Sequence, residues 1–576
     1  MPRSVTQTQV AGGTNFVFDV TQANISPLAS VADFTATING VSVPPGNFVK
    51  LGNNTMQYVG PTLAANAVIT INSLVNYPLN ANVFNPLPYP TTSMLADYVW
   101  NGSTLATPDD SVNSNTFLVS TNGTGNTKAS VVSNGLTFPG ASAVDMTLPA
   151  GVSITSQQAG SLVFGVNNQS YPTGGFNVAL GMGVVNLGTD ANTAAQNGLG
   201  VAWLPNQNAA GVTTNGQSMS WCPYASGSAA FYAADTGLQL TTGPSVCVLV
   251  SNAATVPTMY VNGYKGIAAA NAVTLTGGQA TTTTFALTTA AATGGRLGAG
   301  ASGIGILGRA QTNIVGRFTV YNASLTAIQA LSATFNLFQL MNVSNRIIFD
   351  GDDLFAGMFL SNAQMGSAVP NLLLSSLGSS WCGVNPSLPK RTAATVNGST
   401  NKNNNIAAKL NFLNKDVILL FAGAYDAFTN NGDNSAAIAT SLNTYIGAMQ
   451  GQGYKVAVIT PFAQSQATYN GVASSQTTQT ALNQALNNLA NNIRGVTISS
   501  TSGVAGNAVT GALTNIPNVI IDLASDVNIG FPSISSNSAA TPWTNTIYFT
   551  ADGHNLTPAG CTYVVNNYIL PAILSL

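Results

Sequence analysis

The 576-residue sequence predicts a multidomain protein with two β-rich domains followed by an α/β domain built on a parallel sheet. Short β-branched and aromatic runs, separated by Gly, Asn and Pro turns, fill the first half of the chain. A proline-rich connector interrupts them at 76–93, and strand-like and helix-like segments alternate after 343. We therefore expect domains at residues 1–90, 91–342 and 343–576, since the length exceeds what one core can organise.

Charge is scarce throughout the chain. Only 6% of residues are charged, against about a quarter in ordinary soluble domains, and all 17 acidic residues are Asp. A surface built from neutral polar residues repels other copies weakly and favours close assembly, although a compositional habit of the source would look the same. The 15 basic residues are scattered singly apart from Lys390 and Arg391, so we expect no nucleic-acid partner.

Targeting and metal-binding signals are also missing. No apolar run reaches about 18 residues, so we expect no membrane span. The start, MPRSVTQTQVAGG, lacks the apolar core of a signal peptide. The four cysteines show no metal-ligand spacing, so we expect no metal and no cofactor. Buried free thiols are the default interpretation, and a Cys222–Cys247 bridge remains open.

Residues 1–90 carry the runs FVFDV, DFTATING, NFVKLG, TMQYVG and AVITINSL, which predict a small β-sandwich. The order strand, Asn-Gly turn, strand and closing hydrophobic strand resembles the N-terminal virion-anchoring domain of podovirus-type bacteriophage tail fibres. A generic β-sandwich fits the same pattern. The resemblance implies contacts with other virion proteins through this domain.

Residues 91–342 predict a β jelly roll. MYVNGYKG at 259–266 is a strand, an Asn-Gly turn and a strand, and 304–338 reads as two strands and an amphipathic helix. This order resembles the laminin-G/concanavalin-like jelly rolls, whose pattern places are filled here by Gly308, Arg309, Gly316, Phe318, Tyr321, Leu325 and Gln329. Such domains bind glycans or act as spacers.

A sugar site on this domain would need aromatic faces beside amide or carboxylate groups. The candidate ligand-binding residues are Trp100, Trp203, Trp221 and Tyr232. Packing in the jelly-roll core is the alternative role for each of them.

Residues 343–576 alternate between short apolar runs, which are typical of buried strands, and segments whose apolar residues have helical spacing. RIIFD, DVILLFAG, KVAVITPF and NVIIDLA predict strands. The predicted helices are AAKLNFLNK, SAAIATSLNTYIGAMQ, TQTALNQALNNLANNIRG and AGCTYVVNNYILPAIL. This alternation over more than 200 residues predicts a parallel sheet covered on both faces.

The same stretch resembles the SGNH (GDSL-type) hydrolase family over its full length. In that family a Ser nucleophile follows the first strand, Gly and Asn donors hold the oxyanion, and a D-x-x-H block supplies the His and its orienting Asp. Here GDDL places Asp353 at the nucleophile, VNGST offers Gly398, and GAYD places Tyr425 at the oxyanion Asn. In DGHNLTPAG, Asp552 keeps its place but His554 arrives one residue early and Asn555 takes the expected histidine place.

These replacements oppose ester hydrolysis. A carboxylate at Asp353 is a poor nucleophile, carries no proton for a base to remove, and repels a developing oxyanion. Losing the Asn donor at Tyr425 would cost about 10²–10³ in rate. Three alternatives stay open: His554 as a pocket or merely a loop histidine, a cation site at Asp350, Asp352 and Asp353, and Asp pairs acting on glycosides.

The combination of domains is similar to the virion adhesins of tailed bacteriophages, which implies a tail fibre, head fibre or spike on the virion surface. Our leading hypothesis is a receptor-binding protein, made in the host cytoplasm, that binds host cell-surface polysaccharide. Because such adhesins are usually trimers, the resemblance implies a homotrimer. The SGNH-like domain would then be inactive. The alternatives are a polysaccharide O-deacetylase and a purely architectural virion component.

Overall fold

The computed structural model divides the chain into two compact units, Met1–Val83 and Phe84–Gln450 together with Tyr454–Leu576. It describes residues 4–8, 16–19, 34–44, 47–50, 55–73, 86–99, 118–121, 130–132, 135–137, 144–147, 159–168, 182–186, 198–207, 213–224, 234–252, 258–266, 296–297, 313–357, 359–397, 413, 416–469, 471–495, 509, 511–531 and 541–576. None of the helices in these ranges combines the length and the apolar character needed to cross a membrane.

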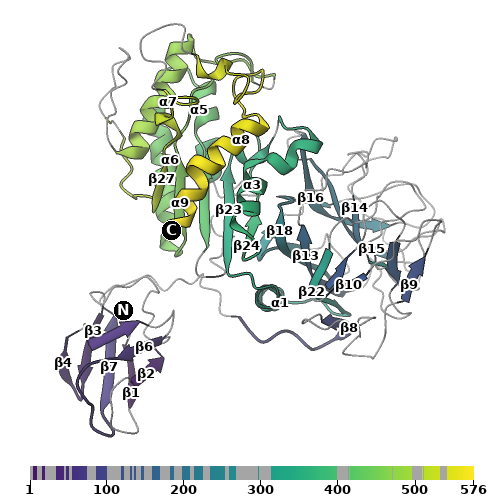
Figure 1. Cartoon of the computed structure of the whole chain (residues 1–576), viewed down its shortest axis with the longest axis vertical. Helices are drawn as coiled ribbons and strands as arrows, with labels where there is room; N and C mark the ends of the chain where they lie inside the picture. The colour runs from purple at the N-terminus through teal and green to yellow at the C-terminus, as the bar shows by residue number, and fades with distance from the viewer. Residues whose placement is uncertain are drawn as a thin grey trace. The chain divides into compact units, whose positions relative to one another are not determined.

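The first unit consists of antiparallel strands in two sheets, which agrees with the predicted β domain (Figure 1). One sheet has the order β1-β7-β3-β4 and the other β2-β6-β5. The strands are β1 (Ser4–Thr8), β2 (Phe16–Asp19), β3 (Phe34–Ile38), β4 (Val41–Val43), β5 (Phe48–Lys50), β6 (Thr55–Tyr58) and β7 (Val68–Ser73). One buried cluster joins residues of both sheets, including Phe48, Tyr58 and Ile71.

The second unit begins with two larger antiparallel sheets. The first has the order β10-β11-β22-β13-β18-β19-β20, with β8 paired to β22, and the second has the order β17-β16-β15-β14-β21-β12-β9. Their strands are β8 (Met94–Val99), β9 (Leu118–Thr121), β10 (Ser130–Val132), β11 (Gly135–Thr137), β12 (Val144–Thr147), β13 (Ala159–Asn168), β14 (Met182–Asn186), β15 (Gly198–Gln207), β16 (Thr213–Tyr224), β17 (Ala234–Gln239), β18 (Gly243–Asn252), β19 (Thr258–Val261), β20 (Tyr264–Gly266), β21 (Arg296–Leu297) and β22 (Asn313–Tyr321). The region is therefore β-rich, as the sequence predicts.

The predicted strand and amphipathic helix near residue 330 are confirmed as β22 and α1 (Ala327–Leu340). Strand alternation directs Val163 of β13 toward the cluster that contains α1, whereas its neighbours Leu162 and Phe164 belong to the main core. Thr326 caps α1 in a capping box with Gln329, which fixes where the helix begins.

The C-terminal part is an α/β fold on a five-stranded parallel sheet of order β24-β23-β25-β26-β27. The strands are β23 (Asn345–Gly351), β24 (Trp381–Val384), β25 (Val417–Phe421), β26 (Lys455–Ile459) and β27 (Val519–Ile521). The longer helices are α3 (Val369–Leu377), α6 (Ser435–Gly451) and α7 (Gln479–Arg494). Shorter ones are α2 (Asp353–Ala356), η4 (Asn362–Ser367), α4 (Ala393–Asn397), α5 (Ala424–Thr429), η6 (Leu523–Ser525), η8 (Pro542–Thr544), α8 (Pro558–Val564), the π-helical turn η9 (Val565–Ile569) and α9 (Leu570–Leu574).

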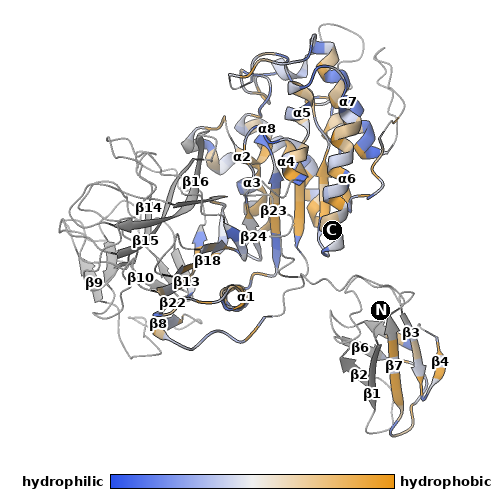
Figure 2. Cartoon of the chain, turned by 180° about the vertical axis from the view of Figure 1, so that it is seen from behind, coloured by the Kyte–Doolittle hydropathy of each residue, from blue (hydrophilic) through white to orange (hydrophobic). Residues whose placement is uncertain are grey.

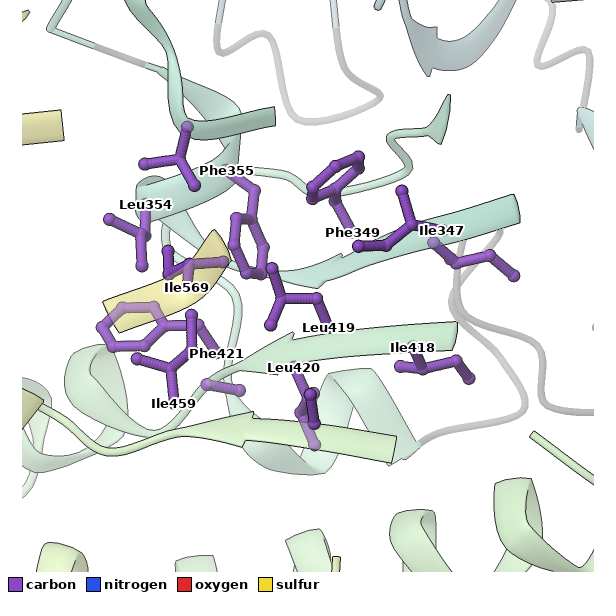
Figure 3. Close-up of a cluster of buried hydrophobic side chains, with 14 of the residues drawn as sticks. Ile347, Phe349, Leu354, Phe355, Ile418, Leu419, Leu420, Phe421, Ile459 and Ile569 are labelled. Atoms are coloured by element: carbon purple, nitrogen blue, oxygen red, sulfur yellow. The ribbon is translucent and has the colours of Figure 1, made fainter. Parts of the chain in front are cut away.

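Helices cover both faces of this sheet. α3, α8 and α9 lie on one face, and α6 and α7 lie on the other (Figure 1). The central strands carry mostly hydrophobic residues (Figure 2), as expected for strands buried on both sides. Figure 3 shows side chains of β23 and β25, such as Phe349 and Leu419, packed together within this core.

A polar joint links the β-rich part to the α/β part within the second unit. The predicted Asn-Gly turn of the β19–β20 hairpin inserts Asn262, whose side chain accepts from the backbone N–H of Val246 at 2.7 Å and donates to the Gly383 carbonyl at 2.7 Å. Arg346 of β23 donates to the Asn262 carbonyl at 2.7 Å. Nearby, Gln239 and Asn385 form an isolated antiparallel bridge.

Candidate functional site

The predicted site lies at the carboxyl edge of the parallel sheet, between β23 and β25. β24 is added on one side of β23, and β25 and the later strands are added on the other side. The connections therefore leave in opposite directions at this point, and a crevice forms outside the carboxyl ends of β23 and β25. Asp352 and Asp353 directly follow β23, and Tyr425 lies in the first turn of α5 after β25.

Glycine brings these two strand ends into contact. Gly351 has φ of +147°, and a Cβ atom there would lie 1.9 Å from the Phe421 carbonyl oxygen. The next residue, Asp352, donates its backbone N–H to that same oxygen at 3.1 Å. The glycine of the GDDL segment therefore sets the path that presents both aspartates.

A pocket forms at this edge, and three of the five predicted site residues line it: Asp353, Tyr425 and His554. The complete lining is Asp352, Asp353, Leu354, Gly357, Phe359, Leu360, Phe421, Ala424, Tyr425, Phe428, Phe462, Gln464, Tyr469, His554, Asn555, Leu556 and Cys561. The space that water centres can occupy is about 30 Å³, which is room for two or three waters. Asp552 lies behind the lining, and Gly398 is outside the described residues.

The two adjacent aspartates, Asp352 buried and Asp353 half-buried, are not fully hydrogen-bonded. Asp352 is 2% exposed, and one carboxyl oxygen each of Asp352 and Asp353 has no hydrogen-bond partner. Burial raises the pKa of Asp353 to about 7, with a smaller contribution from Asp552, against the lowering effect of the Lys390 backbone N–H. Burial and then the charge of Asp353 raise the pKa of Asp352 well above its ordinary value.

The histidine block places Asn555, and not His554, beside its aspartate. Asp552 accepts from the Asn555 side-chain amide at 2.9 Å and from the backbone N–H groups of Asn555 at 3.3 Å and His554 at 3.0 Å. The His554 Nε2 lies 3.1 Å from the Ala467 carbonyl oxygen. The imidazole is thus a pocket residue, but Asp552 binds its backbone and does not orient its ring.

An aromatic wall surrounds the histidine. The Tyr469 ring lies 4.8 Å from that of His554, 5.8 Å from those of Tyr425 and Phe428, and 6.1 Å from that of Phe359, between centroids. Burial lowers the pKa of His554, which favours a neutral imidazole. The Tyr469 hydroxyl is buried and has no hydrogen-bond partner.

Asp350 belongs to a separate cluster of polar side chains and is not grouped with the other two aspartates. Asp350 accepts from the Tyr445 hydroxyl and pairs with Arg391 at 3.5 Å. The three aspartates therefore do not converge, which does not fit the cation site that the sequence left open. Within the described ranges, no group of three or more His, Cys or Asp side chains is placed to hold a metal ion.

Sequence reasoning missed Phe359, Phe428, Gln464 and Tyr469 as pocket residues. Tyr469 and Gln464 lie in the irregular segment between β26 and α7, and Phe359 lies just after α2. No periodicity marks such positions, so only the folded chain brings them together.

The four aromatic residues predicted to bind a sugar lie in the β-rich middle region. Trp100 and Tyr232 lie outside the described residues. Trp203 on β15 is paired in register with Met219, and Trp221 on β16 with Val201, but their side chains are not described. Cys247 is a buried free thiol, so the Cys222–Cys247 bridge is not formed.

Comparison with known proteins finds distant likeness in solved structures alone. No family model matches, and no curated protein matches. A Trypanosoma rangeli sialidase in complex with sialic acid aligns at 14% identity over 49% of this chain and 42% of its own, with a TM-score of 0.28. The binding domain of botulinum neurotoxin serotype D aligns at 11% identity over 45% of this chain and 54% of its own, with a TM-score of 0.27. The chain thus spans about half the length of these structures, and similarity at this level says nothing about what it binds.

Proposed function

We propose that this chain is a virion adhesin of a tailed bacteriophage that binds a host-surface glycan, with an SGNH-like C-terminal domain that holds its ligand without hydrolysing it. The observation that carries this proposal is the bond between Asp552 and Asn555. It puts an amide, which cannot take up a proton at neutral pH, in the place where a hydrolase of this kind needs its general base.

The rest of the pocket supports binding without hydrolysis. Asp353 stands in the nucleophile place with no proton acceptor bonded to it, and its charged form would repel an oxyanion. The only histidine of the sequence has its Nε2 against the Ala467 carbonyl. At the same time, Asp352, Asp353 and Tyr469, each with an unpartnered oxygen, line the same pocket as several aromatic rings, a mixture that suits a polar ligand with apolar edges.

The wider role rests on the sequence pattern. A β-rich N-terminal domain, a proline-rich connector and a β-rich middle region precede the pocket domain, and these support a fibre or spike on the virion surface. The N-terminal domain would attach to other virion proteins, and the adhesin would assemble as a homotrimer. The sparse charge of the chain is compatible with such close packing.

The first experiment measures two quantities on the intact protein: binding to an array of bacterial surface glycans, and acetate release from O-acetylated members of that array. We expect saturable glycan binding and no acetate release, with binding weakened in Asp353→Ala. Acetate release that disappears in Asp353→Ala would overturn the non-hydrolytic assignment and make the chain a polysaccharide O-deacetylase. Binding to no glycan would favour the purely architectural role.

A further inference from the structure

The walls of the pocket form an aromatic enclosure. Tyr469 is the centre of the set, and its ring lies within 6.1 Å of the rings of Phe359, Tyr425, Phe428 and His554. All five rings line the same pocket. The faces of such rings carry negative partial charge and attract a cation placed within about 6 Å of their centroids.

The floor of the pocket is acidic. Asp352 and Asp353 each keep one buried oxygen without a hydrogen-bond partner, and Asp426 raises the pKa of Asp352 further. No lysine or arginine is among the described residues that line the pocket. Arg391 is already paired with Asp350 at 3.5 Å.

The aromatic rings and the two aspartates together favour a positively charged ligand over a neutral or a negatively charged one. An anionic group, such as the carboxylate of an acidic sugar, would face buried carboxyls with no cation to compensate it. A neutral group would bring no positive charge, so the carboxyl groups of Asp352 and Asp353 would either stay protonated or carry a negative charge that nothing compensates. A cation would satisfy the carboxylate oxygens and the ring faces together.

We propose that the pocket binds an organic ammonium group carried by the glycan, either the primary ammonium of an amino sugar or the quaternary ammonium of a choline substituent. This inference rests on the proposed glycan binding and specifies which chemical group the pocket recognises. The water-accessible space of about 30 Å³ suits one such group and excludes a whole sugar ring. The rest of the glycan would stay outside.

Binding of choline, whose quaternary ammonium does not titrate, should depend on pH through the protein alone. The titratable and charged groups around Asp353 are Asp352 beside it, Asp426 on α5, Asp552 and His554 near the C-terminus, Tyr425, and Lys390 and Arg391. A cation binds the ionised carboxylate, and the pKa of Asp353 is about 7, so affinity should increase about tenfold between pH 6 and pH 8.

The test is calorimetric titration of the intact protein with choline, glucosamine, N-acetylglucosamine and glucose. We expect choline or glucosamine to bind and the two neutral sugars to bind at least about tenfold more weakly. Asp353→Asn, which keeps the shape of the side chain, should lose about tenfold in affinity for the cation. Asp433→Asn is the matched control, because Asp433 is exposed and lies outside the pocket lining. An amide oxygen can keep its cap on the Ser435 N–H at 2.9 Å, and the change gives up the bond from the Asn488 amide at 2.6 Å.

A second variant separates the two ammonium classes. Tyr469→Phe keeps the ring and removes the unpartnered hydroxyl, which can accept from a primary ammonium but not from the quaternary ammonium of choline, which has no N–H. Weaker glucosamine binding with unchanged choline binding would assign the primary amine, and strong choline binding in both proteins would assign the quaternary group.

Glucose that binds as tightly as both ammonium compounds, or Asp353→Asn that binds them as tightly as the native protein, would overturn the inference. A protein that binds array glycans but neither ammonium compound would contradict this inference and leave the proposed function in place. Ammonium binding without binding to any array glycan would contradict the proposed function and leave this inference in place.

Discussion

Replacing Arg346 by methionine tests how strongly a buried ion pair stabilises the α/β domain. Arg346 and Asp416 lie 2.5 Å apart with side chains only 1% and 0% exposed. Arg346→Met leaves the Asp416 carboxylate buried without its cation and removes the donor to the Asn262 carbonyl. Removing one partner of such a pair costs about 3–5 kcal/mol, a large part of the about 5–15 kcal/mol that stabilises a domain.

A second ion pair in the same domain provides a matched control. Arg494 and Asp522 also lie 2.5 Å apart, but the Asp522 side chain is 31% exposed, so water can solvate it when Arg494 is replaced. Arg494→Met should therefore cost only about 1 kcal/mol or less. The double variant Arg346→Met, Asp416→Leu should recover much of the loss, because no charge is then left buried.

The assay is urea unfolding followed by helical circular dichroism, since the described helices of eight residues or more lie at or beyond α1 and mainly report the α/β domain. The reasoning is refuted if Arg346→Met and Arg494→Met cost the same free energy of unfolding, because burial is the main difference between the two pairs. A double variant less stable than Arg346→Met alone would refute it as well.

Three further predictions concern stability. Gly351→Ala should destabilise by more than about 2 kcal/mol, because its Cβ would meet the Phe421 carbonyl at 1.9 Å, whereas Gly432→Ala has open space and should lose less in thermal unfolding. Since the folded pKa of Asp353 is raised from 3.8 to about 7, its protonated form adds stability below pH 4 that is lost as pH rises through about 7. Asp353→Asn should therefore gain stability relative to the native protein between pH 5 and pH 8, and an unchanged difference across that range would contradict the assignment. Thr326→Ala should cost about 1 kcal/mol through loss of the α1 cap, and Thr326→Ser should restore the thermal midpoint.

The parallel sheet could be predicted because its strands and helices are periodic. β25 and β26 are short apolar runs, and α6 and α7 carry helical spacing, so β25, β26, α6 and α7 appear where the sequence places them. α3 and β24 were not predicted. They are short, and the apolar run at the start of α3 fits a helix or a strand equally well.

The joint between the two parts of the second unit was beyond sequence reasoning. The Asn262-Gly263 turn predicts a hairpin, but nothing local shows that its amide reaches Gly383, more than 100 residues away. Arg346 directly precedes the apolar run 347–349 of β23, and its partner Asp416 is 70 residues further along the chain. Pairing of this kind depends on tertiary packing, which the periodicity of either segment does not record.

On the proposed function, Asp552 accounts for a pocket that keeps its shape without hydrolysing its ligand. Its carboxylate accepts from two successive backbone N–H groups and from the Asn555 amide, so the turn is held by bonds that any neutral or charged side chain at 554 would leave intact. Moving the His554 ring into the position of Asn555 would break the bonds that define the turn. The shape of the pocket therefore depends on Asp552 and on the glycine-directed path before Asp353, whereas proton transfer depends on the side chain at 555. The proposed function needs only the first two, because holding a ligand requires the shape of the pocket and no proton transfer.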